Sequence, residues 1–132
     1  DLSFAAGETE WEGQVVAAHH KLHRMEERML ANDLSAREEW KRYDWEFHQA
    51  LISACGSASL MAVHGNVFDR YLRYQMLALT FRGAIAVEQH QQLMQAALDR
   101  DGARAKEVLR RHIDGGVEDS LAANPPVWAP DP

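Results

Sequence analysis

The chain has 132 residues and a formal net charge of −6 at pH 7, with 46% hydrophobic and 26% charged residues. This length fits one domain with its own core, and the composition is ordinary for a globular protein. An apolar run near the ~20 residues of a membrane span and a signal segment are both absent, and the single cysteine, Cys55, excludes an internal disulfide. We therefore expect a cytoplasmic protein with no membrane contact. The acidic balance also argues against direct binding of a nucleic-acid backbone.

Helical periodicity runs along the chain, and sparse breaks divide it. Residues 1–7, DLSFAAG, look like the end of an earlier helix, as if the chain were cut from a longer protein. The first full helix is predicted over about residues 9–30, where apolar side chains recur every three or four positions. Ser35 and Glu38 form an S-x-x-E pattern, which predicts a capping box at the start of a second helix that Gly56 closes.

Three more helices are predicted in the second half of the chain. One begins near residue 57 or 59 and ends around residues 81–83, with Leu60, Val63, Val67, Tyr71, Tyr74 and Ala78 in one row at steps of three or four residues. The next covers about residues 84–100, with Ala86, His90, Leu93 and Ala97 in one row. Asp101 is expected to cap the last helix, in which the inward residues are Ala105, Val108, Leu109, His112 and Ile113.

The pattern as a whole predicts an all-α fold. Residues do not alternate between apolar and polar over more than a few positions, so we expect no sheet. Short connections between helices favour antiparallel neighbours. The prediction is an antiparallel bundle of about five to six helices over residues 1–123, followed by an unstructured tail at 124–132, where the prolines of NPPVWAPDP prevent a helix.

Three histidines lie on the apolar stripes of three different helices, and they suggest a metal site. A single imidazole in such a position is most often a hydrogen-bonded core residue. Here His48, His90 and His112 are joined by Asp44, which is one helical turn from His48 and so shares its face. One buried divalent cation would satisfy all four groups. Mixed nitrogen and oxygen donors suit zinc, our first choice, and also nickel, manganese, cobalt or iron.

Two other groups of histidines have simpler interpretations. HHKLH, residues 19–23, is expected to be a solvated face, although His19 and His23 have the i, i+4 spacing of a surface chelate. His64 lies near the stripe of its helix. It is interpreted as a core-edge residue bonded to a backbone carbonyl, with a metal ligand or a pocket-lining residue as the alternative.

The spacing of these groups resembles a known family. The pattern D-x3-H at Asp44 and His48, E-x-H at Glu88 and His90, and a third histidine in RRHIDG resembles the FCD domain. This is the effector-binding domain of FadR-subfamily GntR transcription regulators. The segments FHQALISACGS and AALDRDGARAKEVLRRHI resemble it too, and the likeness covers about residues 8–122.

The resemblance implies a function that residue patterns alone do not give. It assigns metal ligation to Asp44, His48, His90 and His112. It also implies a homodimer, a small carboxylate effector that completes the metal's coordination, and operator DNA bound through an N-terminal winged helix-turn-helix domain. That domain and most of the first FCD helix are absent from this chain, and Gln89 stands where members commonly have glutamate.

Candidates for effector binding follow from the chemistry of a carboxylate. An arginine can bind its oxygens in a bidentate manner, and hydroxyl or imidazole groups can line the pocket. The candidates are Arg70, Arg73, Arg82, Tyr43 and His64, although Arg73 is expected on a solvated side of its helix. The leading hypothesis is a ligand-sensing and dimerisation domain. The alternative is a metal-dependent hydrolase or oxygenase, against which stands the lack of a carboxylate placed as a general base.

Overall fold

The protein is all-α, as the sequence predicts. A computed structural model describes residues 1–78 and 81–123, and within them every regular element is helical. The elements are α1 (Leu2–Ala6), α2 (Thr9–Leu30), the short 3-10 turn η1 (Leu34–Ala36), α3 (Arg37–Ile52), α4 (Ala58–Ala78), α5 (Ala84–Leu98) and α6 (Gly102–Ala123). The predicted tail at 124–132 lies outside the described residues. None of the described helices combines the length and the apolar character needed to cross a membrane.

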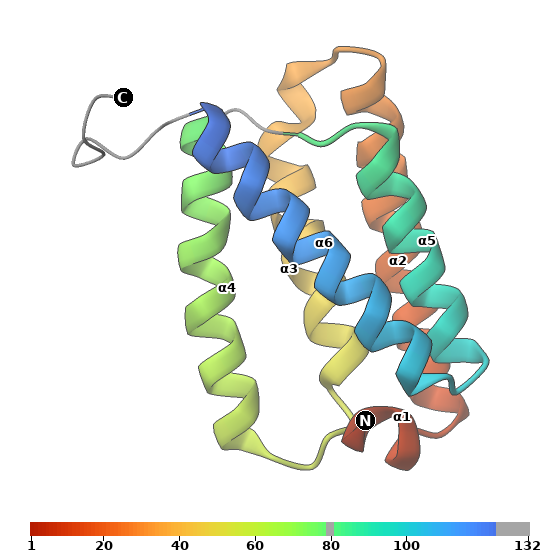
Figure 1. Cartoon of the computed structure of the whole chain (residues 1–132). Coiled ribbons are helices and arrows are strands. Elements are labelled where there is room, and N and C mark those ends of the chain that lie inside the picture. The colour runs from red at the N-terminus through yellow and green to blue at the C-terminus, as the bar shows by residue number, and fades with distance from the viewer. Residues whose placement is uncertain (79–80, 124–132) are drawn as a thin grey trace.

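The long helices form an antiparallel bundle (Figure 1). α2 packs against α3 and α5, α5 packs against α6, and α3 packs against α4. The two helices of each pair run in opposite directions, because each short connection between successive long helices turns the chain back. α4 and α6 run in the same direction, and α1 lies at the end of the bundle where α3 finishes (Figure 1).

The core forms where the apolar stripes of α2, α3, α5 and α6 meet. Its largest fully buried apolar side chains are Phe47, Leu22 and Leu93, and small residues on α5 allow close approach. Arg100 fixes the end of the bundle near α1. It adopts a positive φ of 58° just after α5, and its guanidinium donates to Glu12 Oε1 and to the carbonyl oxygens of Phe4 and Gly7.

The predicted capping box at Ser35 and Glu38 is wrong. Ser35 lies inside η1, and the cap is Asp33, whose Oδ1 accepts hydrogen bonds from the Ser35 backbone N at 3.1 Å and the Ser35 Oγ at 2.6 Å. Asp33 also accepts from Arg28 Nε at 2.8 Å, so a local polar network replaces the expected box. The helix that follows ends at Ile52, four residues before Gly56, which has a φ of 72°.

The first half of the predicted apolar row of α4 is not buried. Leu60, Val63 and Val67 are 52%, 61% and 63% exposed, whereas Leu72 of the same helix is buried. The three exposed residues line a cavity between α4, α1 and α6, so they face inward toward space that described residues do not fill. Ile113, expected inside on α6, is likewise 44% exposed. The side chains of Tyr74 and Ala78 lie outside the described part of the chain.

Candidate metal centre

Three histidines from three helices meet in the middle of the bundle. His48 comes from α3, His90 from α5 and His112 from α6, and all three are buried. Each occupies an apolar stripe, so the packing that buries the leucines of these helices also brings the imidazoles together. Asp44 is one turn before His48 and is buried beside them. The structure thus brings together the four residues selected from the sequence.

The distances in this cluster suit a single ion. One ligand atom from each histidine can be chosen so that all three lie within 4.8 Å of one another. Asp44 Oδ1 is 3.2 Å from His90 Nε2 and 3.7 Å from His48 Nε2, and the two Nε2 atoms are 3.4 Å apart. Ligand atoms about 2.1 Å from one metal are separated by about 3.0 Å at right angles and about 3.4 Å at the tetrahedral angle. Three imidazoles and a carboxylate therefore fit a divalent transition metal in both spacing and chemistry.

The pKa values of the ionisable groups in the cluster are shifted in different directions. Burial lowers the pKa of His48 to about 4 and that of His112 to about 2, so both imidazoles are neutral at pH 7. Burial alone would also lower the pKa of His90, but hydrogen bonds to Asp44 and Glu26 raise it to about 9. For Asp44, burial is outweighed by the hydrogen bond from His90 and by the neighbouring imidazoles, and its pKa is lowered. Neutral imidazole and ionised carboxylate are the forms that bind metals, so a metal bound here would displace the second ring proton of His90.

Two residues outside the predicted ligand set hold the imidazoles in place. Glu26 of α2 is fully buried, and its Oε1 lies 2.5 Å from His90 Nδ1. Gln89 of α5 places its Oε1 2.9 Å from His112 Nδ1. In each case the outer ring nitrogen donates to an oxygen, which leaves Nε2 for the cluster. A signal for Glu26 was present, because it lies four residues after Leu22 and thus near the apolar stripe of α2.

Arg82 contacts residues of the cluster from outside, and its side chain does not line the cluster. Its Nη1 lies 3.3 Å from Gln89 Oε1 and 3.1 Å from the carbonyl oxygen of His112, and its Nε lies 2.7 Å from Asp119 Oδ2. The guanidinium occupies the space beside Gly115, where a Cβ would collide with it. Arg82 is therefore joined to the cluster through Gln89 and His112.

The other effector candidates lie away from the cluster. Arg70 is exposed, and Arg73 forms an exposed ion pair with Asp69 at 2.6 Å. Tyr43 is packed beneath Lys21 and Arg42, whose cationic groups are 5.2 and 4.7 Å from its ring centroid. The structure does not bring these three residues to the imidazoles.

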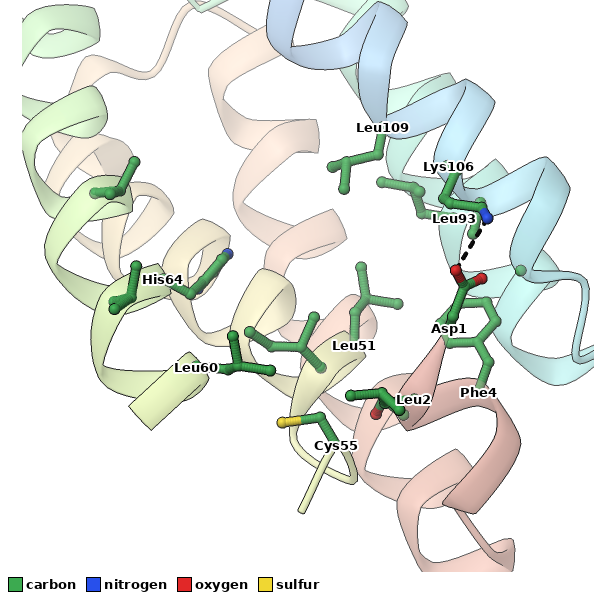
Figure 2. A pocket seen from close by; sticks show the side chains of 16 residues that line it. Asp1, Leu2, Phe4, Leu51, Cys55, Leu60, His64, Leu93, Lys106 and Leu109 are labelled. Carbon is green, nitrogen blue, oxygen red and sulfur yellow. Dashed lines mark hydrogen bonds and ion pairs between the residues drawn. The ribbon is translucent and has the colours of Figure 1, made fainter. Parts of the chain in front are cut away.

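His64 lies at the wall of a cavity next to the cluster (Figure 2). Its Nδ1 pairs with Gln49 Nε2 at 2.9 Å in place of the expected backbone carbonyl, and its ring stacks on Phe68, which in turn contacts His48. Burial lowers the pKa of His64. The ring of Phe68 thus lies between His64 and the cluster, and His64 lines the cavity.

The cavity itself is apolar and measures about 550 Å³. Leu51, Leu93 and Leu109 line it, and each is three residues from a histidine of the cluster on the same helix. The cavity therefore begins about one helical turn from the imidazoles, on the side of α1. In Figure 2 the leucines and His64 surround the space, and an ion pair between Asp1 and Lys106 at 3.0 Å lies at its edge.

Comparisons with known proteins agree on the family. Residues 4–115 match the FCD domain. The chain is 36% identical over 113 residues to the uncharacterized HTH-type transcriptional regulator BphR of Paraburkholderia xenovorans, covering 84% of this chain and 46% of that protein. It is 37% identical over 121 residues to the HTH-type transcriptional repressor GlaR of Escherichia coli, covering 85% of this chain and 53% of that protein. The chain thus spans about half the length of these curated relatives. No solved structure matches it.

Proposed function

Because the chain belongs to the FCD domain family, we propose that it is the effector-sensing and dimerisation domain of a bacterial transcription regulator of the FadR subfamily. In this proposal it binds a divalent metal through Asp44, His48, His90 and His112, and a carboxylate effector completes the coordination. The effector modulates operator binding by an N-terminal helix-turn-helix domain, so the regulator acts in the cytoplasm. The proposed domain comprises residues 1–123.

The enzyme alternative is not retained. The FCD family is regulatory, and both relatives carry names of transcriptional regulators. The buried carboxylate nearest the cluster, apart from Asp44, is Glu26, and it is engaged by His90 Nδ1 on the side away from the other imidazoles. The domain is therefore a regulatory module and not an enzyme.

The observation that carries the metal proposal is the separation of the ligand atoms. Asp44, His48 and His90 hold their ligand atoms 3.2 to 3.7 Å apart, and a ligand atom of His112 lies within 4.8 Å of those of the other two imidazoles, so the four groups form a donor set that one ion can bind. Zinc is the first candidate, with nickel, manganese, cobalt and iron as alternatives. Four protein ligands leave one or two positions on a five- or six-coordinate ion, which a carboxylate or hydroxy acid can fill through its oxygens. The adjacent cavity offers room for the carbon skeleton of such an acid.

Metal analysis and calorimetry test this proposal together. Purified protein should contain close to one divalent ion per chain, and small hydroxy or dicarboxylic acids should bind the metal-loaded form and not the chelator-treated form. Equal affinity for both forms would refute metal-assisted effector binding. Light scattering should give the mass of a dimer, and a monomer at micromolar concentration would refute the dimer.

A further inference from the structure

Glu26 occupies a position that calls for a physical explanation. It lies on the buried side of α2 with 0% exposure, although an isolated carboxylate is costly to bury. Its Oε1 lies 2.5 Å from His90 Nδ1. Its Oε2 has no hydrogen-bond partner among the described residues, and the imidazole Nδ1 of His23 lies 3.7 Å from it. His90 is therefore the group that stabilises this carboxylate.

The contact with Glu26 decides which nitrogen of His90 faces the cluster. An imidazole that donates through Nδ1 to a carboxylate directs Nε2 the other way, and Nε2 of His90 lies 3.2 Å from Asp44 Oδ1 and 3.4 Å from His48 Nε2. A carboxylate in this outer position also makes the ligating nitrogen more basic. His112 has the equivalent contact from a neutral amide, Gln89. Only His90, of these two, is held by a charge.

The same carboxylate changes the charge of the site. A divalent ion with Asp44 alone would leave one positive charge in the bundle, whereas a divalent ion with Asp44 and Glu26 is balanced. Resting on the proposed function, we propose that Glu26 is a positioning residue that fixes His90 for metal binding and neutralises the loaded site. An anionic ligand is then bound through the open coordination positions and not through net charge.

Replacement of Glu26 should therefore have two effects of opposite sign. Glu26→Gln keeps the shape but removes the charge, so it should weaken metal binding about 10- to 100-fold, as loss of an outer-shell partner commonly does. Once loaded at saturating metal, the variant carries one more positive charge and should bind a simple monoanion several-fold more tightly than the wild type. A residue needed only for folding would not strengthen anion binding.

The test uses Co²⁺ as the metal and azide as the monoanion. Co²⁺ affinity is measured by competition with a chromophoric chelator, and azide affinity from changes in the Co²⁺ absorption bands. Glu27→Gln is the matched control, because it removes the same charge from the exposed neighbouring position, where Glu27 pairs with Arg24. This control should match the wild type in both measurements.

The outcomes separate the two proposals. If the wild type does not bind Co²⁺, the proposed metal site itself is refuted. If the wild type binds and Glu26→Gln has the same Co²⁺ affinity within twofold, the role of Glu26 is refuted alone. Weaker Co²⁺ binding by Glu26→Gln without tighter azide binding would refute the neutralising role, because this variant lacks the charge that Glu26→Asp keeps. Should Glu26→Gln not fold by circular dichroism, Glu26→Asp takes its place, and it should weaken Co²⁺ binding without strengthening azide binding.

Discussion

His19 illustrates how burial changes one residue of a segment that was expected to be solvated. Its neighbour His20 is exposed, but His19 is buried against Phe47, and its Nε2 has no hydrogen-bond partner among the described residues. Burial lowers the pKa of His19 to about 4, even though Glu26 opposes the shift, and His90 and His23 add to it. His19 is thus neutral in the folded protein at pH 7, and it does not form the exposed chelate with His23 that its spacing allowed.

The acid stability of the chelator-treated protein should reflect this residue. The folded pKa lies below the unfolded value of 6.5, so the stabilising effect is complete above pH 6.5 and is lost as the pH falls toward 4. His19→Leu should flatten the decline of unfolding free energy in this window, by at most about 1.4 kcal/mol per pH unit. Urea unfolding at a series of pH values measures the slope, with His20→Leu as the exposed control. Parallel curves for wild type and His19→Leu would contradict the prediction.

A second prediction at the residue scale concerns metal removal. Because a metal binds the folded state, it should raise the melting temperature, by an amount worth about 2.7 kcal/mol at a free concentration 100 times Kd. His112→Ala should abolish most of this rise, since it removes one ligand. His64→Ala should keep it, because His64 lies one ring beyond the cluster. Differential scanning fluorimetry with zinc and with chelator compares the three proteins, and an unchanged rise in His112→Ala would count against the site.

At the scale of elements, the junction between α1 and α2 depends on close packing. A Cβ at Gly7 would lie 2.5 Å from Trp11 Cε3 and 2.9 Å from the Ser3 carbonyl oxygen. Trp11 cannot easily move, because its Nε1 donates to the Ala50 carbonyl oxygen at 2.9 Å and Arg100 lies over its ring. Gly7 is therefore required by space, whereas Gly13, inside α2, has nothing within 4 Å of its Cβ position.

The two glycines should respond to alanine in opposite directions. Gly7→Ala should destabilise the protein by about 1–3 kcal/mol through overpacking. Gly13→Ala should stabilise it by up to about 1 kcal/mol, because alanine has the higher helix propensity. Urea unfolding of both variants provides the comparison. A Gly7→Ala variant as stable as the wild type would show that the junction can relax.

The helices themselves were predictable, and their ends and partners less so. α2 begins and ends at the predicted residues because its apolar stripe is continuous and both ends have clear breaks. The cap before α3 was misassigned, because the carboxylate of Asp33, which Arg28 at the end of α2 holds in place, accepts the Ser35 backbone N–H. Periodicity on α4 located the apolar face, but it carries no information on whether another element covers that face.

In the candidate site, too, some residues could be predicted from the sequence and others could not. Asp44, His48, His90 and His112 could be selected because polar groups on apolar stripes conflict with burial unless they share a partner. Their positions agree with that selection, and metal ligation by them stays a prediction. Glu26 was missed because its contact with His90 depends on how α2 and α5 cross, which sequence spacing within one helix does not specify.

For the whole molecule, the net charge and the share of each relative that the chain covers both argue against DNA binding by this chain itself. The chain carries a net charge of −6 and spans about half of each relative. DNA contacts depend on lysine and arginine neutralising phosphates, which an acidic chain opposes.

This chain alone should therefore not bind DNA. Fluorescence anisotropy with a labelled promoter duplex at low salt should show no saturable binding, whereas a full-length regulator of the same family provides the positive control. Salt-sensitive, sequence-specific binding by this chain would contradict the prediction.

The position of Arg82 has a consequence for how a signal could leave the site. One guanidinium joins Gln89, the His112 carbonyl oxygen and Asp119, so we expect a movement of His112 to reach Asp119, two turns further along α6. Thermodynamic linkage is reciprocal, so a change at that end must in turn alter metal affinity. Asp119→Asn, which touches no imidazole, should shift the Co²⁺ affinity measured by chelator competition, while Glu118→Gln, its exposed neighbour, should leave it unchanged. The end of α6 would then be a second place from which the occupancy of the site can be adjusted.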